Sequence, residues 1–177
     1  WLDVTEDVHV DTYGTYIATP QVSAEAAQVA VVTTVKNSSP KKQYVTLLQK
    51  VKDATGKVLA KSKSQRVVVE AGKAFDVKQL LDLAQPKLWT PESPTLYTLE
   101  TSVKAGGSTT DVYTSTFGIR AIAFDPNRGF LLNGKQVKLK GMCLHHDAGA
   151  MGVAVPLRSY ERRLEILKEY GVNALRM

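Results

Sequence analysis

Short runs of alternating apolar and polar residues, separated by turn residues, extend along the chain from Thr15 to about Asp125. The turns recur at intervals of roughly 8 to 12 residues, which is typical of an antiparallel β-sandwich. One expected strand covers residues 44–53, with Val45, Leu47 and Val51 on the same face. A helical spacing of apolar residues is absent here, so two packed antiparallel sheets are predicted. The other expected strands are residues 28–35, 57–62, 65–70, 74–80, 97–104 and 109–117.

The size of this region, about 110 residues, is that of an immunoglobulin-like sandwich domain, and the chain of 177 residues leaves room for part of a second domain. The composition, 44% hydrophobic and 23% charged, excludes disordered and fibrous proteins. The single cysteine, Cys143, cannot form an internal disulfide. Because the apolar runs are much shorter than the roughly 20 residues that span a bilayer, no membrane span is expected.

The pattern changes after about residue 125. An Asn133-Gly134 turn between residues 129–132 and 135–141 predicts a β-hairpin. Residues 159–170 place Glu161, Glu165 and Glu169 opposite an apolar stripe, which predicts an amphipathic helix with a solvated acidic face. An apolar run follows, so residues 135–177 are expected to form an incomplete βαβ unit with parallel strands, cut from a larger α/β domain of a longer polypeptide.

The formal net charge of +6 raises the question of an anionic partner. The basic residues of the predicted sandwich alternate with or flank apolar residues, which is the pattern of a solvated outer strand face. No series of aromatic residues that could stack on bases accompanies them, so nucleic-acid binding is not expected.

A candidate site lies directly after the first predicted parallel strand. Adjacent residues of an extended chain point to opposite faces, so His145, His146 and Asp147 would not all converge on a metal ion without distortion. A nucleophile pair of Cys143 and His145 would need a third, orienting group. In α/β barrels the carboxyl ends of the strands build the active site, which favours contact with a substrate. Loop residues that hydrogen-bond to one another are the alternative.

Two further residues have alternative roles. Arg176 closes the second predicted parallel strand and so emerges at the same end of the sheet as His145, either in a shared site or in a structural ion pair. Trp89 lies in a Pro-rich connection, where a tryptophan more often anchors a loop by packing than stacks on a sugar.

Several sequence motifs, in their order and spacing, resemble glycoside hydrolase family 2. They are KLWTPESPTLY at residues 87–97, FGIR at 117–120, GFLLNGK at 129–135, KGMCLHHD at 140–147 and GVNALR at 171–176. The resemblance implies three parts. Residues 1–10 would be the tail of a preceding jelly-roll sugar-binding domain, residues 11–122 an immunoglobulin-like β-sandwich, and residues 123–177 the start of a catalytic (β/α)8 barrel.

The resemblance also implies a function. Family members hydrolyse glycosides with retention by means of two glutamates, and both come after the segment matched here, so no catalytic residue is expected in this chain. His145, His146 and Asp147 would contact the sugar, and Arg176 would support the nucleophile by lowering its pKa. The histidine at position 145 resembles the histidine of the galactosidase and glucuronidase branches at the matching position, whereas the mannosidase branch usually has Trp there. His146-Asp147 departs from the Glu-His or Glu-Asp of the best-known members.

A β-galactosidase acting on terminal β-galactosides of oligosaccharides is therefore the first expectation. A β-glucuronidase of the same family, or a sandwich that serves only as a scaffold or binding module, is the alternative. No metal ion or cofactor is expected in this segment. The expected partners are the carbohydrate substrate of the full-length enzyme, neighbouring domains of the same chain and, in a homo-oligomer, further copies.

Overall fold

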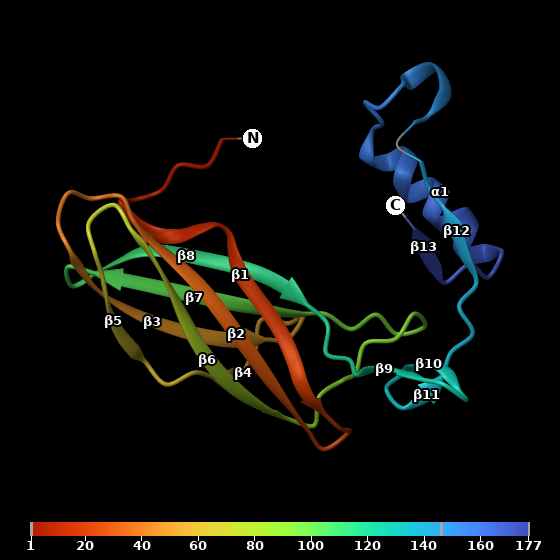
Figure 1. Cartoon of the computed structure of the whole chain (residues 1–177), viewed down its shortest axis with the longest axis horizontal. Helices are drawn as coiled ribbons and strands as arrows, with labels where there is room; N and C mark the ends of the chain where they lie inside the picture. The colour runs from red at the N-terminus through yellow and green to blue at the C-terminus, as the bar shows by residue number, and fades with distance from the viewer. Residues whose placement is uncertain (1, 146, 177) are drawn as a thin grey trace. The chain divides into compact units, whose positions relative to one another are not determined.

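The computed structural model of the chain, shown in Figure 1, describes residues 2–145 and 147–176. Internal contacts divide the chain into two compact units, Trp1–Ala121 and Ile122–Met177. The first unit is a two-layered β-sandwich, and the second combines short strands with one α-helix. Among the described residues, the helices are too short or too polar to cross a membrane.

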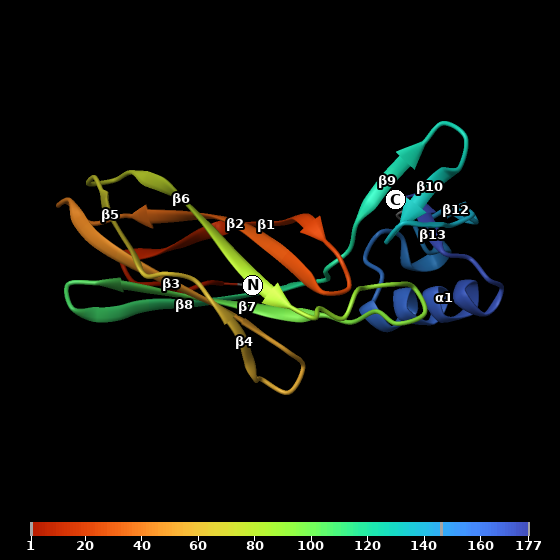
Figure 2. The ribbon, with the colours of Figure 1, turned by 90° about the horizontal axis from the view of Figure 1, so that it is seen from below.

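The sandwich consists of two antiparallel sheets, seen as layers in Figure 2. The first, here called sheet A, has the order β1-β2-β6; the second, sheet B, has the order β4-β3-β7-β8, with β5 also paired to β3. The strands of sheet A are β1 (Val8–Val22), β2 (Ala26–Asn37) and β6 (Ala74–Ala84). Those of sheet B are β3 (Gln43–Lys52), β4 (Val58–Lys61), β5 (Gln65–Val69), β7 (Tyr97–Ala105) and β8 (Ser108–Phe117).

The core lies between the sheets and confirms the predicted alternation, because Val45, Leu47 and Val51 are fully buried. It consists of two apolar clusters, one toward each end of the strands. A polar layer of Thr33, Gln49 and Thr101 lies at the inward positions between the clusters and is equally buried. The side-chain Nε2 of Gln49 in sheet B donates to Thr33 Oγ1 of sheet A over 2.8 Å and to Thr101 Oγ1 over 3.4 Å.

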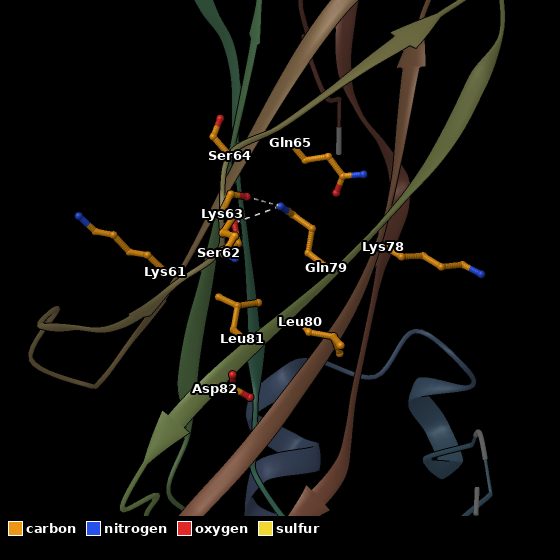
Figure 3. Close-up of a pocket in the computed structure, with 10 residues that line it drawn as sticks. All are labelled: Lys61, Ser62, Lys63, Ser64, Gln65, Lys78, Gln79, Leu80, Leu81 and Asp82. Carbon is orange, nitrogen blue, oxygen red and sulfur yellow. Dashed lines mark hydrogen bonds between the residues drawn. The ribbon is translucent and has the colours of Figure 1, made fainter.

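A second buried glutamine makes the reciprocal link from sheet A. Gln79 Nε2 donates to Ser62 Oγ over 3.1 Å and to the Lys63 carbonyl over 2.9 Å, in the segment that joins β4 to β5 (Figure 3). Within the described part of the chain, the Oε1 atoms of Gln49 and Gln79 are buried without a hydrogen-bond partner. The two sheets are thus joined by hydrogen bonds as well as by apolar contact, and both links leave a buried carbonyl unpaired.

Strand β1 departs most from the sequence-based expectation. It begins at Val8, and Val8 and Val10 are buried in the sandwich core, although the sandwich was expected to begin at residue 11. Register shifts on both sides of residues 15–18 and a positive φ of 55° at Tyr13 interrupt its alternation. The backbone at Gly14 lies close to that of Asp11, and only a glycine fits there. An added Cβ would lie 2.7 Å from the Asp11 carbonyl oxygen. These irregularities hide the strand from a period-2 pattern.

The second unit begins with a small antiparallel sheet of β9 (Ile122–Asp125), β10 (Gly129–Leu132) and β11 (Lys135–Gln136). Its predicted Asn-Gly hairpin is confirmed, with φ of 51° at Asn133 and 76° at Gly134. The predicted continuous strand over residues 135–141 is wrong, because β11 ends at Gln136 and a separate strand, β12 (Gly141–Cys143), follows. The cause is that the chain leaves the hairpin after Val137, whose N–H still donates to the Phe130 carbonyl over 2.9 Å, and reaches a different pairing partner, β13 (Ala174–Arg176).

Helix α1 (Leu157–Glu169) lies between β12 and β13 in the sequence, after a 3-10 turn, η1 (Gly149–Met151). The helix begins directly after its N-cap residue Pro156, whose ψ of 143° is extended, and Gly171, with φ of 77°, follows its end as predicted. Strands β12 and β13 pair in parallel.

Candidate functional site

The parallel pair β12–β13 brings the carboxyl ends of both strands together. Met142 lies opposite Leu175 and Cys143 opposite Arg176, and the Leu144 N–H donates to the Arg176 carbonyl over 2.9 Å. The loop that leaves β12 therefore starts beside the last residue of β13. This is the juxtaposition predicted for the residues that follow the first parallel strand.

The opposite end of the pair is fixed by Asn173. Its backbone N–H donates to the Lys140 carbonyl over 3.1 Å, and its side-chain Oδ1 accepts from the Lys140 N–H over 2.8 Å. Its Nδ2 donates to the Lys138 carbonyl over 3.0 Å. These three bonds tie the start of β13 to the segment before β12, and so they set which residues meet at the carboxyl ends.

The structure places the predicted site residues as follows. His145 and Asp147 are exposed in the loop after β12, and His146 lies outside the described residues. Arg176 is exposed, with its Nη1 3.9 Å from the Cys143 Sγ. The structure thus brings Arg176 to Cys143, with His145 two residues further along the chain.

Asp147 has a different neighbour, since its carbonyl accepts a hydrogen bond from Arg163 Nη1 of α1 over 3.2 Å. This contact ties the loop to the helix. Sequence reasoning missed both Asn173 and this role of Arg163. An asparagine immediately before a strand was a visible signal, whereas the contact of Arg163 depends on the path of the loop.

The carboxylates of α1 lie on a solvent-exposed face, as predicted. Arg158 holds Glu165 with two hydrogen bonds, of 2.7 Å and 3.1 Å, and also contacts Glu161 at 3.4 Å. The Arg158 guanidinium lowers the pKa of Glu165 and so favours its charged form. An ionised carboxylate already engaged by arginine is suited to stabilising the helix surface rather than to donating a proton.

Trp89 packs within the sandwich unit. Its backbone N–H donates to the Ile119 carbonyl over 2.8 Å, Gly118 lies against its side chain, and the guanidinium carbon of Arg120 lies 5.0 Å from its ring centroid. These contacts confirm that Trp89 anchors its loop by packing. They also join two of the motifs noted in the sequence, residues 87–97 and residues 117–120.

Comparison with known proteins agrees with these motifs. Residues 8–120 match the model of the glycosyl hydrolases family 2, and the chain belongs to this family. The β-galactosidase BoGH2A of Bacteroides ovatus is 42% identical to it over 176 residues, which is 99% of this chain and 21% of that enzyme. The chain therefore spans about a fifth of the length of this relative.

Solved structures are similar to this chain over nearly its whole length. A glycosyl hydrolase family 2 member from Bacteroides cellulosilyticus has a TM-score of 0.91 at 35% identity, covering 98% of this chain and 24% of that one. The β-glucuronidase of Bacteroides uniformis has a TM-score of 0.88 at 30% identity, covering 98% of this chain and 22% of that one.

Proposed function

We propose that this chain is a segment of a retaining exo-β-glycosidase that hydrolyses terminal β-galactosides in oligosaccharides. The observation that carries the proposal is the 42% identity over 176 residues to a β-galactosidase. A β-glucuronidase is the alternative, supported by the similarity to the enzyme from Bacteroides uniformis at 30% identity. A sandwich without a catalytic role in its parent protein is the remaining alternative.

In this proposal the sandwich unit is the immunoglobulin-like domain of the enzyme. The residues before β1 would leave a preceding jelly-roll sugar-binding domain. Strands β12 and β13 and helix α1 would open the (β/α)8 barrel. Their parallel pairing supports this assignment, because each strand of such a barrel is parallel to the next and is followed by a helix.

The proposed site residues follow from the same barrel geometry. Active sites of (β/α)8 barrels lie at the carboxyl ends of the strands, where β12 leads into His145 and β13 ends at Arg176. His145, His146 and Asp147 would contact sugar hydroxyls. Arg176 would be a supporting residue whose positive charge keeps the nucleophilic carboxylate ionised.

The two carboxyl groups of the reaction would lie outside this chain. Retaining hydrolysis requires an acid/base and a nucleophile about 5 to 5.5 Å apart on either side of the glycosidic bond. The carboxylates of α1 do not suit these roles, because Glu161 and Glu165 are exposed on a helix and paired with Arg158. The isolated chain is therefore expected to have no glycosidase activity.

The test compares aryl β-galactoside with aryl β-glucuronide as substrates of the full-length protein. A kcat/KM at least about a hundredfold higher for the galactoside, a difference of roughly 3 kcal/mol, supports the proposal. The reverse preference supports the glucuronidase, and hydrolysis of neither substrate refutes both. Turnover by the isolated chain that survives His145→Ala would show that the catalytic residues are wrongly assigned.

A further inference from the structure

The excess positive charge of the sandwich lies on the outer face of sheet B. The register pairs Lys50 with Lys61 on one side and with Glu100 on the other, so the three form a row across β4, β3 and β7. A second row joins Arg66, Thr46 and Lys104 across β5, β3 and β7. We call this surface the basic face. Its cations are Lys50, Lys52, Lys61, Arg66 and Lys104.

The basic face is only partly neutralised. Glu100 accepts hydrogen bonds from Lys50, over 2.9 Å, and from Lys52, and these bonds lower its pKa. Among the described outward positions of sheet B, Glu100 is the only acidic residue, so one carboxylate faces five cations. The outer face of sheet A is more balanced, since Lys36 contacts Asp11 at 3.8 Å, and on β6 Lys78 lies two residues from Asp76 and four residues from Asp82.

A hollow of about 400 Å³ lies at the second row, whose residue on β7, Lys104, is four residues from Glu100. Arg66 and Lys104 lie on either side of Thr46, and the Arg66 guanidinium carbon is held 4.8 Å from the Tyr44 ring centroid. The turn at Gly106-Gly107 does not obstruct the hollow. The space beside both glycines is open, since no heavy atom lies within 4 Å of the position that a Cβ would occupy. The lining includes Tyr44, Thr46, Arg66, Lys104, Gly106 and Gly107.

We propose that the basic face binds an anionic carbohydrate chain, with a uronate carboxylate in the hollow. The planar fork of Arg66 matches a carboxylate, Lys104 adds a second positive charge, and the Thr46 hydroxyl can exchange hydrogen bonds with sugar hydroxyls. The two cationic rows are four residues apart on β3, about 13 Å, so an extended chain contacts both.

Carbohydrate suits this face better than nucleic acid does. Binding of single strands relies on exposed aromatic rings that stack on bases, whereas one face of Tyr44 is already covered by Arg66. Only the choice of a carbohydrate over another polyanion rests on the proposed function. The charge distribution and the hollow are independent of it.

The test measures binding of the 177-residue chain to polygalacturonate oligosaccharides by isothermal titration calorimetry. At a low salt concentration of about 50 mM, the double variant R66Q/K104Q should bind roughly tenfold more weakly, because two ionic contacts are lost. The matched control K36Q/K78Q removes the same charge from sheet A, where Lys78 extends away from Lys61 of the basic face (Figure 3), and should change affinity less than about twofold. Thermal unfolding shows whether each variant is folded.

Other outcomes overturn the proposal. Equal weakening by the two double variants would mean that net charge, and not the basic face, governs binding. Equal affinity for methyl-esterified polygalacturonate would exclude the carboxylate as the recognised group. Single-stranded DNA that binds as tightly, with the same dependence on Arg66 and Lys104, would identify a general polyanion surface. No binding at low salt would refute the site, and none of these results depends on whether the full-length protein hydrolyses galactosides.

Discussion

Replacing Gln49 by methionine tests whether the polar layer stabilises the sandwich. Gln49 is fully buried, and its Nε2 donates to Thr33 Oγ1, while its Oε1 lacks a partner among the described residues. Gln49→Met keeps nearly the same volume and removes an unpaired carbonyl whose burial costs about 1 to 3 kcal/mol. It also loses two hydrogen bonds and leaves the buried Thr33 and Thr101 hydroxyls without this partner, at a similar cost of about 1 to 3 kcal/mol. The free energy of unfolding should therefore change by less than about 2 kcal/mol in either direction.

Gln49→Ala separates packing from polarity at the same site. The alanine also removes the unpaired carbonyl, but it leaves a cavity, so it should be about 2 to 5 kcal/mol less stable than the methionine variant. Urea unfolding followed by tryptophan fluorescence reports on the first unit, because Trp89 packs within it and the second tryptophan, Trp1, precedes β1 in the sequence. Gln65→Met on the exposed edge strand β5 is the control and should shift stability by less than about 0.5 kcal/mol. Destabilisation by Gln49→Met of more than about 2 kcal/mol would refute the reasoning, because the hydrogen bonds to Thr33 and Thr101 would then outweigh the removal of the unpaired carbonyl.

Three further changes have defined outcomes. Gly118→Ala places a Cβ 3.0 Å from three Trp89 atoms and should lower the free energy of unfolding by about 1 to 3 kcal/mol in the same urea assay; an unchanged midpoint would contradict the tight packing. In the full-length enzyme, His145→Ala should lower kcat/KM by the equivalent of about 2 to 4 kcal/mol, and a loss of less than about threefold would leave His145 as a loop residue only. Because hydrogen bonds from Lys52 and Lys50 lower the pKa of Glu100, its charged form stabilises the fold above its ordinary pKa of 4.5, so the stability difference from Glu100→Gln should shrink as the pH falls below that value. A difference that stays constant or grows on acidification would contradict this assignment.

The sandwich strands along which burial alternates strictly were predictable from the sequence. In β3 and β7 every second residue is buried, and their bounds lie within one residue of the expected ones. Strand β1 was harder, because its register shifts break the alternation that a sequence pattern detects. The polar layer was hidden for a different reason. An inward Gln49 has the right spacing but the wrong polarity, so its burial depends on hydrogen bonds with Thr33 and Thr101 that no local pattern reveals.

The candidate site was predictable where it depends on backbone direction alone. Parallel strands end at the same edge, so the approach of the loop after Cys143 to Arg176 followed from the expected order of elements. The register between the strands was not predictable, because it depends on the three hydrogen bonds of Asn173 to residues 138–140. The roles of His145, His146 and Asp147 toward a sugar stay predictions.

The most direct test of the central claim is covalent labelling of the full-length protein with a 2-fluoro β-galactoside that traps the glycosyl-enzyme intermediate. Retaining hydrolysis proceeds through such an intermediate on a carboxylate nucleophile. Peptide mapping by mass spectrometry should find the label on one glutamate outside the segment Trp1–Met177, and the isolated chain should remain unlabelled. A label on Glu161, Glu165 or Glu169, or an active full-length enzyme that acquires no label, would contradict the assignment of this chain to the non-catalytic part of a retaining β-galactosidase.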